Sequence, residues 1–271
     1  MNAAANDGSP PLAVRRPDRR VALITGAGSG AGAEIAREYA RQGVRVVVSD
    51  IDYALAGSVA AEIRGAGGQA LAHRCDVASE EQVAALIQRA MREFGALNFV
   101  VNNAGPYLAD DPLAHWSRLL NTNLLGTLLI TRHAIDAMRE RGGSIVNIAA
   151  DAGLGFGPEE QPVYAAAKAG VLRFTAALHY LNDAHGIRVN CIAPDWIGTD
   201  EVRARVARLT PDERAAQHVP DTLLQTGDFA HAVVALSLRD SCAGRIVLCR
   251  AGRPLELVAW ADPGYRSVEP F

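Results

Sequence analysis

The segment from residue 21 to residue 42 constrains the fold of this chain more than any other part of the sequence. A continuous apolar run, Val21–Thr25, is followed directly by the glycine-rich segment 26–32 and then by the helix-forming segment 34–42. Continuous apolar runs are typical of parallel strands, which are buried on both faces. A glycine-rich turn between such a strand and a helix lets the backbone approach a phosphate group at the positive end of the helix. The segment therefore predicts the phosphate-binding unit of a nucleotide-binding α/β domain, although an ordinary glycine-rich turn has the same composition.

Strand-like and helix-like segments alternate along most of the remaining chain. Further strands are predicted at residues 44–49, 69–74, 97–101, 143–153 (with its exit) and 244–248, and helices at 53–66, 79–94 and 228–238. This alternation indicates parallel βαβ units. We expect one Rossmann-like, doubly wound α/β domain over residues 19–253, with seven mostly parallel strands and helices on both faces. Residues 1–18 are predicted to be a flexible tail, and residues 254–271 a C-terminal extension.

Asp50 ends the second predicted strand, about 20 residues after the glycine-rich segment. At this place an acidic side chain accepts hydrogen bonds from the adenosine ribose of a dinucleotide. The same carboxylate repels a 2′-phosphate, and neither Ser49, Ile51 nor the loop residues Ser29 and Ala31 supply a compensating positive charge. We therefore predict NAD in preference to NADP. The alternative interpretation, a turn residue at the end of a strand, is common for an aspartate.

Tyr164 and Lys168 lie four residues apart in a helix-forming stretch. This spacing places the two side chains on one face of a helix, one turn apart. The ammonium group of a neighbouring lysine lowers the pKa of a tyrosine from about 10, which makes the phenol a better proton-transfer group near neutral pH. The pair predicts acid–base chemistry only if other residues complete a site, because alanine-rich helices hold such pairs by chance.

Charge and cysteine patterns argue against several other classes of function. The formal net charge is −3, so no overall positive charge favours nucleic acid or an anionic membrane surface. No apolar run reaches the roughly 18 residues that a membrane span needs. The four cysteines form no Cys-x-x-Cys pair and the seven histidines no His-Glu-x-x-His motif, so we predict no metal site. These observations predict a cytoplasmic protein with no nucleic-acid or membrane partner.

Together, these motifs resemble those of the short-chain dehydrogenase/reductase family, in its common single-domain form, over residues 19–252. The matching positions are Thr25-Gly26-x-x-x-Gly30-x-Gly32, Asp76, Asn-Asn-Ala-Gly at 102–105, Asn123, Tyr164-x-x-x-Lys168 and the segment 187–194. Each motif alone is weak, but their order and spacing together are specific. The resemblance implies an NAD-dependent oxidoreductase that interconverts a secondary alcohol and a ketone. It also implies a homotetramer or a homodimer.

The resemblance implies roles for individual residues. Tyr164 is expected to be the general acid or base, Lys168 to lower its pKa, and Asn123 to hold a water molecule in a proton relay. The expected cofactor contacts are Gly26, Ser29, Gly30, Ala31, Asp50, Ile51, Asp76, Val77, Asn103, Ala104, Gly105, Tyr164, Lys168, Pro194, Ile197 and Thr199. Residues 196–222 resemble the variable substrate lid of the family. The expected substrate contacts are Ala150, Asp151 and Trp196.

The sequence departs from the family pattern at the end of the fifth strand. Ala150 stands where the family usually has a serine that donates a hydrogen bond to the substrate oxygen, and loss of one such donor typically costs about 10²–10³ in rate. Asp151 follows directly, but it can donate only if its carboxyl group is protonated. Three interpretations stay open: an oxidoreductase with a donor elsewhere, an NAD-binding regulatory or scaffold protein with an impaired site, and an inactivating substitution.

Overall fold

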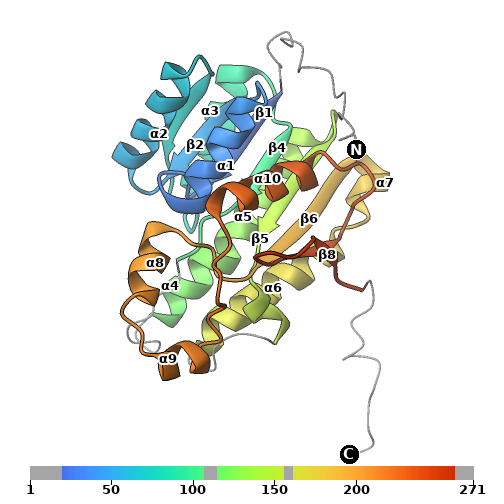
Figure 1. Ribbon diagram of the computed structural model, residues 1–271. Helices are drawn as coiled ribbons and strands as arrows, with labels where there is room; N and C mark the ends of the chain where they lie inside the picture. Colours follow the sequence, from blue (N-terminus) through green and yellow to red (C-terminus); the bar gives the residue numbers. More distant parts are fainter. Residues whose placement is uncertain (1–19, 107–114, 156–160, 260–271) are drawn as a thin grey trace, which may run out of the picture.

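One mixed sheet runs through the part of the computed structural model that is described here, residues 20–106, 115–155 and 161–259 (Figure 1). Its strands are β1 (Val21–Thr25), β2 (Arg45–Asp50), β3 (Ala70–Arg74), β4 (Phe99–Asn102), β5 (Gly143–Ile148), β6 (Ile187–Pro194), β7 (Ile246–Cys249) and β8 (Glu256–Leu257). Their order across the sheet is β3-β2-β1-β4-β5-β6-β7-β8. Strands β1 to β7 are parallel, and β8 pairs antiparallel with β7. The Rossmann-like, doubly wound arrangement predicted from the sequence is thereby confirmed.

Helices cover both faces of the sheet. They are α1 (Gly30–Arg41), α2 (Tyr53–Gly65), α3 (Glu80–Phe94), α4 (Trp116–Leu120), the π-helical turn η1 (Asn121–Leu125), α5 (Gly126–Met138), the 3-10 turn η2 (Asp151–Leu154), α6 (Pro162–Ala177), α7 (Leu181–His185), α8 (Asp200–Val206), α9 (Pro211–Ala216) and α10 (Thr226–Ser237). Buried side chains of α1, α2 and α10 pack against one face, and those of α3, α5 and α6 pack against the other. Figure 1 shows α1 and α10 side by side in the first of these layers.

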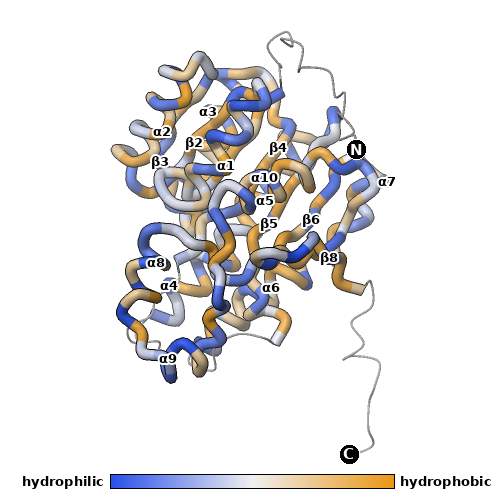
Figure 2. The backbone as a smooth tube through the Cα atoms, in the orientation of Figure 1, coloured by the Kyte–Doolittle hydropathy of each residue, from blue (hydrophilic) through white to orange (hydrophobic). Residues whose placement is uncertain are grey.

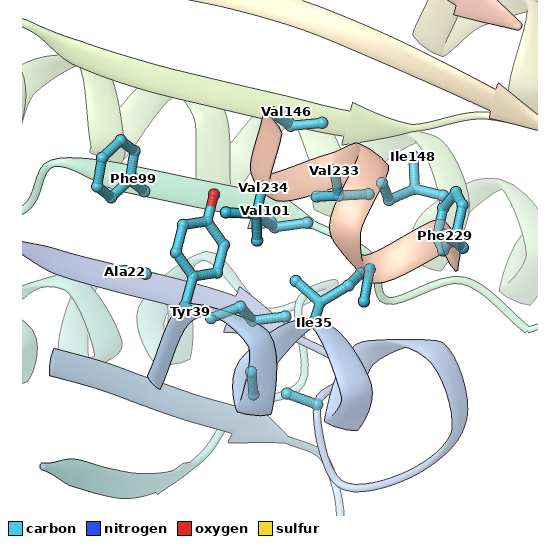
Figure 3. Close-up of a cluster of buried hydrophobic side chains, with 14 of the residues drawn as sticks. Ala22, Ile35, Tyr39, Phe99, Val101, Val146, Ile148, Phe229, Val233 and Val234 are labelled. Atoms are coloured by element: carbon cyan, nitrogen blue, oxygen red, sulfur yellow. The ribbon is translucent and has the colours of Figure 1, made fainter. Parts of the chain in front are cut away.

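The larger core cluster lies between α1, α10 and the sheet (Figure 3). Ile35 and Tyr39 extend from α1 toward Val233 and Val234 of α10. The ring of Tyr39 also packs against that of Phe99 on β4, with 5.4 Å between the ring centroids. Each large apolar side chain buried in this way contributes roughly 1.5–3 kcal/mol relative to exposure. This packing holds α1 in the position where its N-terminus meets the glycine-rich segment.

The sheet has one strand more than the sequence predicted. Strand β8 contains only two residues, and its Leu257 pairs with Val247 of β7 while remaining 48% exposed. So short and exposed a strand cannot show the apolar pattern by which strands are recognised in a sequence. It lies within the predicted C-terminal extension, of which residues 260–271 fall outside the described part, as do residues 1–18.

The strand order reverses between β1 and β4, which is where open parallel sheets bind their ligands. The loops that follow these two strands are joined by hydrogen bonds. Asn103 Nδ2 donates to the carbonyl oxygens of Thr25 and Gly26 at 3.1 and 3.0 Å, and the Asn103 amide donates to Thr25 Oγ1 at 3.1 Å. Two motifs that are 77 residues apart in the sequence therefore border one crevice.

Helices α8 and α9 lie in the segment predicted as the substrate lid, residues 196–222. Figure 1 shows them to one side of the two helical layers. Hydrophobic residues gather in the central strands, whereas the chain around α9 is largely hydrophilic (Figure 2). A single β-bridge between Ile197 and Leu224 joins the two ends of this segment. The segment is thus attached to the body at its base, and its helices contribute no residue to the buried core.

Candidate active site

The glycine-rich segment after β1 forms a tight backbone cradle at the N-terminus of α1. Gly26 and Gly30 have φ angles of +61° and +52°, in the left-handed region that favours glycine. A Cβ at Gly32 would overlap the carbonyl oxygen of Gly26, and one at Gly26 would come 2.9 Å from Ala104 Cα. The first turn of α1 holds no acidic side chain, and Ser29 does not cap the helix with its hydroxyl. The cradle therefore has the space and the N–H groups that a phosphate requires.

Asp50, at the end of β2, faces this cradle. Its Oδ2 accepts a hydrogen bond from the Gly28 amide at 2.9 Å, and its Oδ1 accepts one from the Asp52 amide at 3.0 Å. The two bonds fix the carboxylate beside the glycine-rich segment. The sheet also brings Arg74 of β3 into register with Asp50, and Arg74 Nε donates to the carbonyl oxygen of Ile51 at 3.2 Å. Sequence reasoning missed this cation because the pairing of β2 with β3, and not closeness in the chain, brings its residue beside Asp50.

The residues predicted to contact adenine, Asp76 and Val77, follow β3. The Asp76 side chain accepts from the Ala78 amide at 2.9 Å, and the Asp76 amide donates to Gln82 Oε1 at 2.9 Å. Val77 is buried where α5 begins, and a Cβ at Gly126 would collide with its side chain. Asp76 is therefore held at the crevice by its own turn, whereas Val77 is largely covered.

The chain leaves β6 at Pro194 and comes back to the cradle at Thr199. Thr199 is the N-cap of α8, and its Oγ1 accepts from the Val202 amide at 3.3 Å. Its methyl group would lie 3.2 Å from a Cβ at Gly30. Ile197, between them, packs against the larger core cluster. The segment from 194 to 199 thus brings the base of the predicted lid against the glycine-rich segment.

Lys168 is the only lysine in the sequence, and it is only 3% exposed. Its Nζ donates to the carbonyl oxygen of Ile148, at the end of β5, at 3.0 Å, and lies 5.5 Å from the centroid of the Tyr164 ring. Burial lowers the pKa of Lys168 to about 8. The charged lysine therefore favours the phenolate of Tyr164 and gives up its own proton more easily than a lysine in water.

Asn123 and Gly105 complete this corner of the site. Asn123 lies in η1, and π-helical turns are frequent at functional sites. Its Nδ2 donates to the carbonyl oxygens of Pro106 and Leu119 at 3.2 and 3.1 Å, whereas its Oδ1 is buried with no hydrogen-bond partner in the described part of the chain. A Cβ at Gly105 would overlap Asn123 Oδ1 and lie 3.2 Å from Lys168 Nζ. The two polar groups thus converge on the same small space.

A buried chain of polar side chains supports the site from behind. Asn102 Nδ2 donates to Thr131 Oγ1 at 2.9 Å and to Asn147 Oδ1 at 2.7 Å. Asn147 Nδ2 in turn donates to Thr175 Oγ1 at 2.8 Å. These bonds connect β4 and β5 with α5 and with α6, the helix that carries Tyr164. Sequence reasoning missed this chain, although an asparagine inside an apolar strand signals a buried hydrogen-bond partner.

Beyond β5, the site has a small apolar wall followed by a carboxyl group. Ala150 is 8% exposed and has an extended backbone, and it offers no side-chain donor. Asp151 begins η2 and is half-buried. Burial raises the pKa of Asp151 to about 6; the Ala152 amide opposes this rise, the negative charge of Asp195 adds to it, and Arg250 opposes it.

Asp195 stands at the end of β6, beside β7. Its Oδ2 accepts from the Ala251 amide at 3.2 Å, and its Oδ1 is buried with no hydrogen-bond partner among the residues described. Burial raises the pKa of this carboxyl as well, against the hydrogen bond from Ala251 and the charges of Arg250 and Arg253. Sequence reasoning did not include Asp195 among the site residues.

Two arginines of the predicted lid, Arg203 and Arg205, contact other residues of the same segment, including Trp196. The guanidinium of Arg205 lies 5.4 Å from the Trp196 ring centroid and donates to Gln217 Oε1 at 2.9 Å. Arg203 Nε donates to the carbonyl oxygen of Gly198 at 2.9 Å. A hollow of about 620 Å³ lies on the lid itself, between α8, α9 and residues 219–225. These arginines hold the lid segment together.

Among the described residues, no group of three or more His, Cys, Asp or Glu side chains is arranged to hold a metal ion. No helix among them is long and apolar enough to cross a membrane. The four cysteines are buried and unpaired.

An open parallel sheet with a glycine-rich first turn at its switch point, and a buried lysine near a tyrosine on α6, are features of a Rossmann-like protein that binds a dinucleotide. Comparison with protein families is consistent with this class, because the family described as short chain dehydrogenase matches residues 20–209. The chain belongs to the short-chain dehydrogenase family, as its motifs predicted.

Several characterised dehydrogenases are similar to this chain. Cis-4-hydroxycyclohexanecarboxylate dehydrogenase of Sinomonas cyclohexanicum is 40% identical over 211 residues, which cover 73% of this chain and 84% of that protein. Cyclohexanol dehydrogenase of Acinetobacter sp. (strain SE19) is 37% identical over 224 residues, covering 78% and 87%. The 7alpha-hydroxysteroid dehydrogenase of Escherichia coli (strain K12) is 34% identical over 227 residues, covering 82% and 88%.

Proposed function

We propose that this protein is an NAD-dependent dehydrogenase that interconverts a secondary alcohol on a ring and the corresponding ketone. The observation that carries the proposal is the convergence of Asn123 Oδ1 and Lys168 Nζ on the space beside Gly105, with Tyr164 one helical turn from the lysine. An acceptor and a donor of this kind, buried together next to a phenol, are suited to moving a proton and have no evident structural purpose.

The crevice fits a nicotinamide dinucleotide. The glycine-rich cradle lacks the Cβ atoms that would fill it, and the N-terminus of α1 holds no acidic side chain. We assign the pyrophosphate to Gly26, Gly30 and the helix N-terminus, and the adenosine side to Asp50 and Asp76. The hydride chemistry is supplied by the nicotinamide when it is bound.

In this proposal Tyr164 accepts the hydroxyl proton when an alcohol is oxidised and returns a proton to the oxygen when a ketone is reduced. Lys168 contributes in two ways: its charge favours the phenolate, and its lowered pKa lets it accept or release a proton near pH 8. A water molecule beside Gly105 would accept from Lys168 Nζ and donate to Asn123 Oδ1, and would thereby connect the tyrosine corner with solvent.

The substrate class is proposed from similarity together with the shape of the site. Three similar proteins are named for cyclohexane or steroid alcohols, all of which carry the hydroxyl on a ring. The wall formed by Ala149 and Ala150 is small and apolar, which suits the carbon skeleton of such a ring. Arg203, Arg205 and Arg214 already bind groups of the lid segment, so they do not favour an anionic substrate.

Preference for NAD over NADP is proposed from Asp50. Its carboxylate is fixed beside the cradle by the Gly28 and Asp52 amides and would repel a 2′-phosphate. Arg74 weakens this repulsion without removing it, because its Nε is bonded to the carbonyl oxygen of Ile51.

We also propose that the protein forms a homodimer or homotetramer through α4, η1 and α6. Three large apolar side chains on α4 and η1 support this: Trp116, Leu120 and Leu125 are 43%, 38% and 40% exposed. Sedimentation of the purified protein would test the assembly, and a monomer at micromolar concentration would contradict it.

The test of the proposed function is nicotinamide absorbance during NAD⁺ reduction and NADH oxidation, measured over a panel of cyclic alcohols and ketones. The natural protein, Tyr164→Phe and Ala150→Ser would be compared. We expect turnover by the natural protein that is lost in Tyr164→Phe. If only Ala150→Ser turns over, the natural site is disabled, and an NAD-binding regulatory role is favoured instead.

A further inference from the structure

The end of β5 lacks the hydrogen-bond donor that carbonyl chemistry there requires. A developing negative charge on the substrate oxygen needs a fixed donor, and Ala150 has none. The residue that follows, Asp151, begins η2 and is half-buried. It lies three residues beyond Ile148, whose carbonyl oxygen accepts from Lys168 Nζ at 3.0 Å. The first polar side chain after the apolar wall is therefore a carboxyl group next to the proton-transfer corner.

The turn that carries Asp151 is packed firmly against α6. A Cβ at Gly153 would come 2.8 Å from the amide nitrogen of Ala169, so no space separates the turn from the helix of Tyr164 and Lys168. The Gly153 amide also donates to the carbonyl oxygen of Ala150 at 3.0 Å, which closes the turn. Asp151 is held at a fixed place relative to the tyrosine and lysine.

Two charged groups act on Asp151, and both come from the ends of nearby strands. Asp195, directly after β6, raises its pKa, and Arg250, directly after β7, lowers it. Arg250 is itself drawn toward β8, because its guanidinium pairs with Glu256 at 3.2 Å. Lys168, on α6, directs its ammonium group to the carbonyl oxygen of Ile148. No cation of the described residues is thus committed to holding Asp151 ionised.

Asp195 lies at the end of the strand next to β5: Asp151 and Asp195 each follow by three residues the paired Ile148 and Ile192 of β5 and β6, and the charge of Asp195 raises the pKa of Asp151. One oxygen of Asp195 accepts from the Ala251 amide at 3.2 Å, and the other is buried with no hydrogen-bond partner in the described residues. A buried carboxylate oxygen without a donor is costly, so burial disfavours the ionised form of this site. Two carboxyl groups in one site hold a proton to a higher pH than either would alone.

We propose that Asp151, in its protonated form, donates a hydrogen bond to the substrate oxygen in place of the hydroxyl missing at position 150, and that Asp195 is the positioning residue that keeps the proton on Asp151. The inference rests on the proposed dehydrogenase function. Asp151 undergoes no net proton transfer: the hydride moves between the substrate carbon and the nicotinamide, Tyr164 exchanges the proton of the substrate oxygen, and Asp151 keeps its own.

The proposal fixes the sign of a pH dependence. Donation requires the protonated carboxyl, whose pKa is about 6 in the protein without substrate and rises further when substrate excludes water. Ketone reduction should therefore weaken as pH increases through this pKa. The opposite role, an ionised Asp151 that binds a cationic substrate, would make activity increase over the same range.

Three variants test the donor directly, with kcat/KM for ketone reduction measured from pH 5 to 9. We expect Asp151→Ala to lose about 10²–10³ in kcat/KM, the usual effect of removing one such donor. Asp151→Asn, which keeps an N–H donor at every pH, should stay within roughly tenfold of the natural protein and lose the decline near pH 6–7. Ala150→Ser combined with Asp151→Ala should recover most of the loss, because it restores a hydroxyl at the neighbouring position.

Asp195→Asn tests the positioning role. It removes the negative charge that raises the pKa of Asp151, so the decline in activity should move to lower pH. A readout that needs no turnover is the titration of side-chain carboxyl carbons by NMR in protein labelled with ¹³C-aspartate. We expect a resonance that titrates near pH 6, is missing in Asp151→Asn and titrates at lower pH in Asp195→Asn.

The outcomes separate this inference from the proposed function. Turnover that depends on Tyr164 but is unchanged in Asp151→Ala overturns the inference and leaves the function standing. Activity that increases with pH near 6–7 and is lost in Asp151→Asn assigns Asp151 to a cationic substrate and also overturns it. If the natural protein turns over no substrate, the proposed function fails, and an Asp151 resonance that titrates at the ordinary pH of an aspartate would independently overturn the proton-holding pair.

Discussion

The two sides of the crevice are built in different ways. On the β1–β2 side, the proposed cofactor site is built from the backbone: glycines with forced conformations, amides and one carboxylate held by two amides. On the β5–β6 side, the proposed reaction site is built from side chains whose pKa values are shifted by burial, namely Lys168, Asp151 and Asp195. The first side tolerates almost no added atom. The second side allows different residues, provided that the required charge and proton are present.

This difference explains where the sequence follows its family and where it departs. A phosphate cradle requires the absence of Cβ atoms, and only glycine meets that requirement. A hydrogen-bond donor for a substrate oxygen can be a hydroxyl, an amide or a protonated carboxyl. The departure at Ala150 therefore falls on the side where chemically different residues can serve the same purpose.

The strongest test of the backbone side is Gly32→Ala. The new Cβ would overlap the carbonyl oxygen of Gly26 and come 2.5 Å from Asn103 Nδ2, so the cradle and its link to the β4 loop must shift. We expect loss of measurable NAD binding in calorimetry and destabilisation by several kcal/mol, as for other forced overlaps in packed sites.

Gly57→Ala is the matched control for this change. Gly57 lies inside α2 with nothing within 4 Å of its added Cβ, so alanine there should stabilise the protein by about 0.5–1 kcal/mol and leave NAD binding unchanged. Equal effects of the two substitutions would contradict the contrast between the two sides.

On the side-chain side, the largest expected effect is that of Tyr164→Phe. If the hydroxyl is the proton-transfer group, as we propose, its removal should lower kcat by roughly 10²–10⁴ with little change in NAD binding. Tyr180→Phe is the control, because Tyr180 is 54% exposed and should be silent. A fall in binding that matches the fall in kcat would argue against a purely catalytic role.

Lys168 offers a test in which activity and stability move in opposite directions. Its folded pKa of about 8 lies below the ordinary 10.5, so the folded state binds its proton less well than the unfolded chain does. The resulting loss in the free energy of unfolding is complete below pH 8 and disappears as pH increases toward 10.5. Lys168→Met should therefore be inactive yet more stable by roughly 1–3 kcal/mol at pH 7, an advantage that shrinks at pH 10.

Two measurements check this prediction. Urea unfolding of both proteins at pH 7 and pH 10 gives the stability difference and its pH dependence. Because Lys168 is the only lysine, lysine labelled with ¹³C gives a single side-chain resonance whose titration reads the pKa directly. A midpoint at the ordinary lysine value would contradict the buried, weakly basic ammonium group.

The smallest expected effect concerns cofactor choice. Asp50→Ser removes the repulsion of a 2′-phosphate and leaves Arg74 close by, so the ratio of NADP to NAD efficiency should increase by roughly tenfold to a hundredfold. Steady-state kinetics with both cofactors measures the ratio. Adding Arg74→Ala should remove part of the gain; if it does not, the arginine plays no part in the binding of the phosphate.

Much of the fold could be predicted because its signals are local. Continuous apolar runs indicate strands buried on both faces, and their alternation with helices leaves few topologies other than a doubly wound sheet. Strand β8 was missed because two exposed residues carry no such pattern. The buried chain of hydrogen bonds was missed because its members come from four different elements, although each asparagine stands out in its strand. These members are Asn102, Thr131, Asn147 and Thr175.

By itself, the sequence determined the glycine-rich cradle, the helical spacing of Tyr164 and Lys168 and the absence of a hydroxyl at position 150, since each is a property of residues that are close together in the chain. Only the tertiary structure decided that Arg74 stands beside Asp50, that Asn123 and Lys168 meet at Gly105, and that Asp151 and Asp195 follow neighbouring strands. The physical reason is that pKa values and hydrogen-bond partners depend on what surrounds a group in space. Burial and the charges on neighbouring strands, which a one-dimensional pattern does not encode, set both.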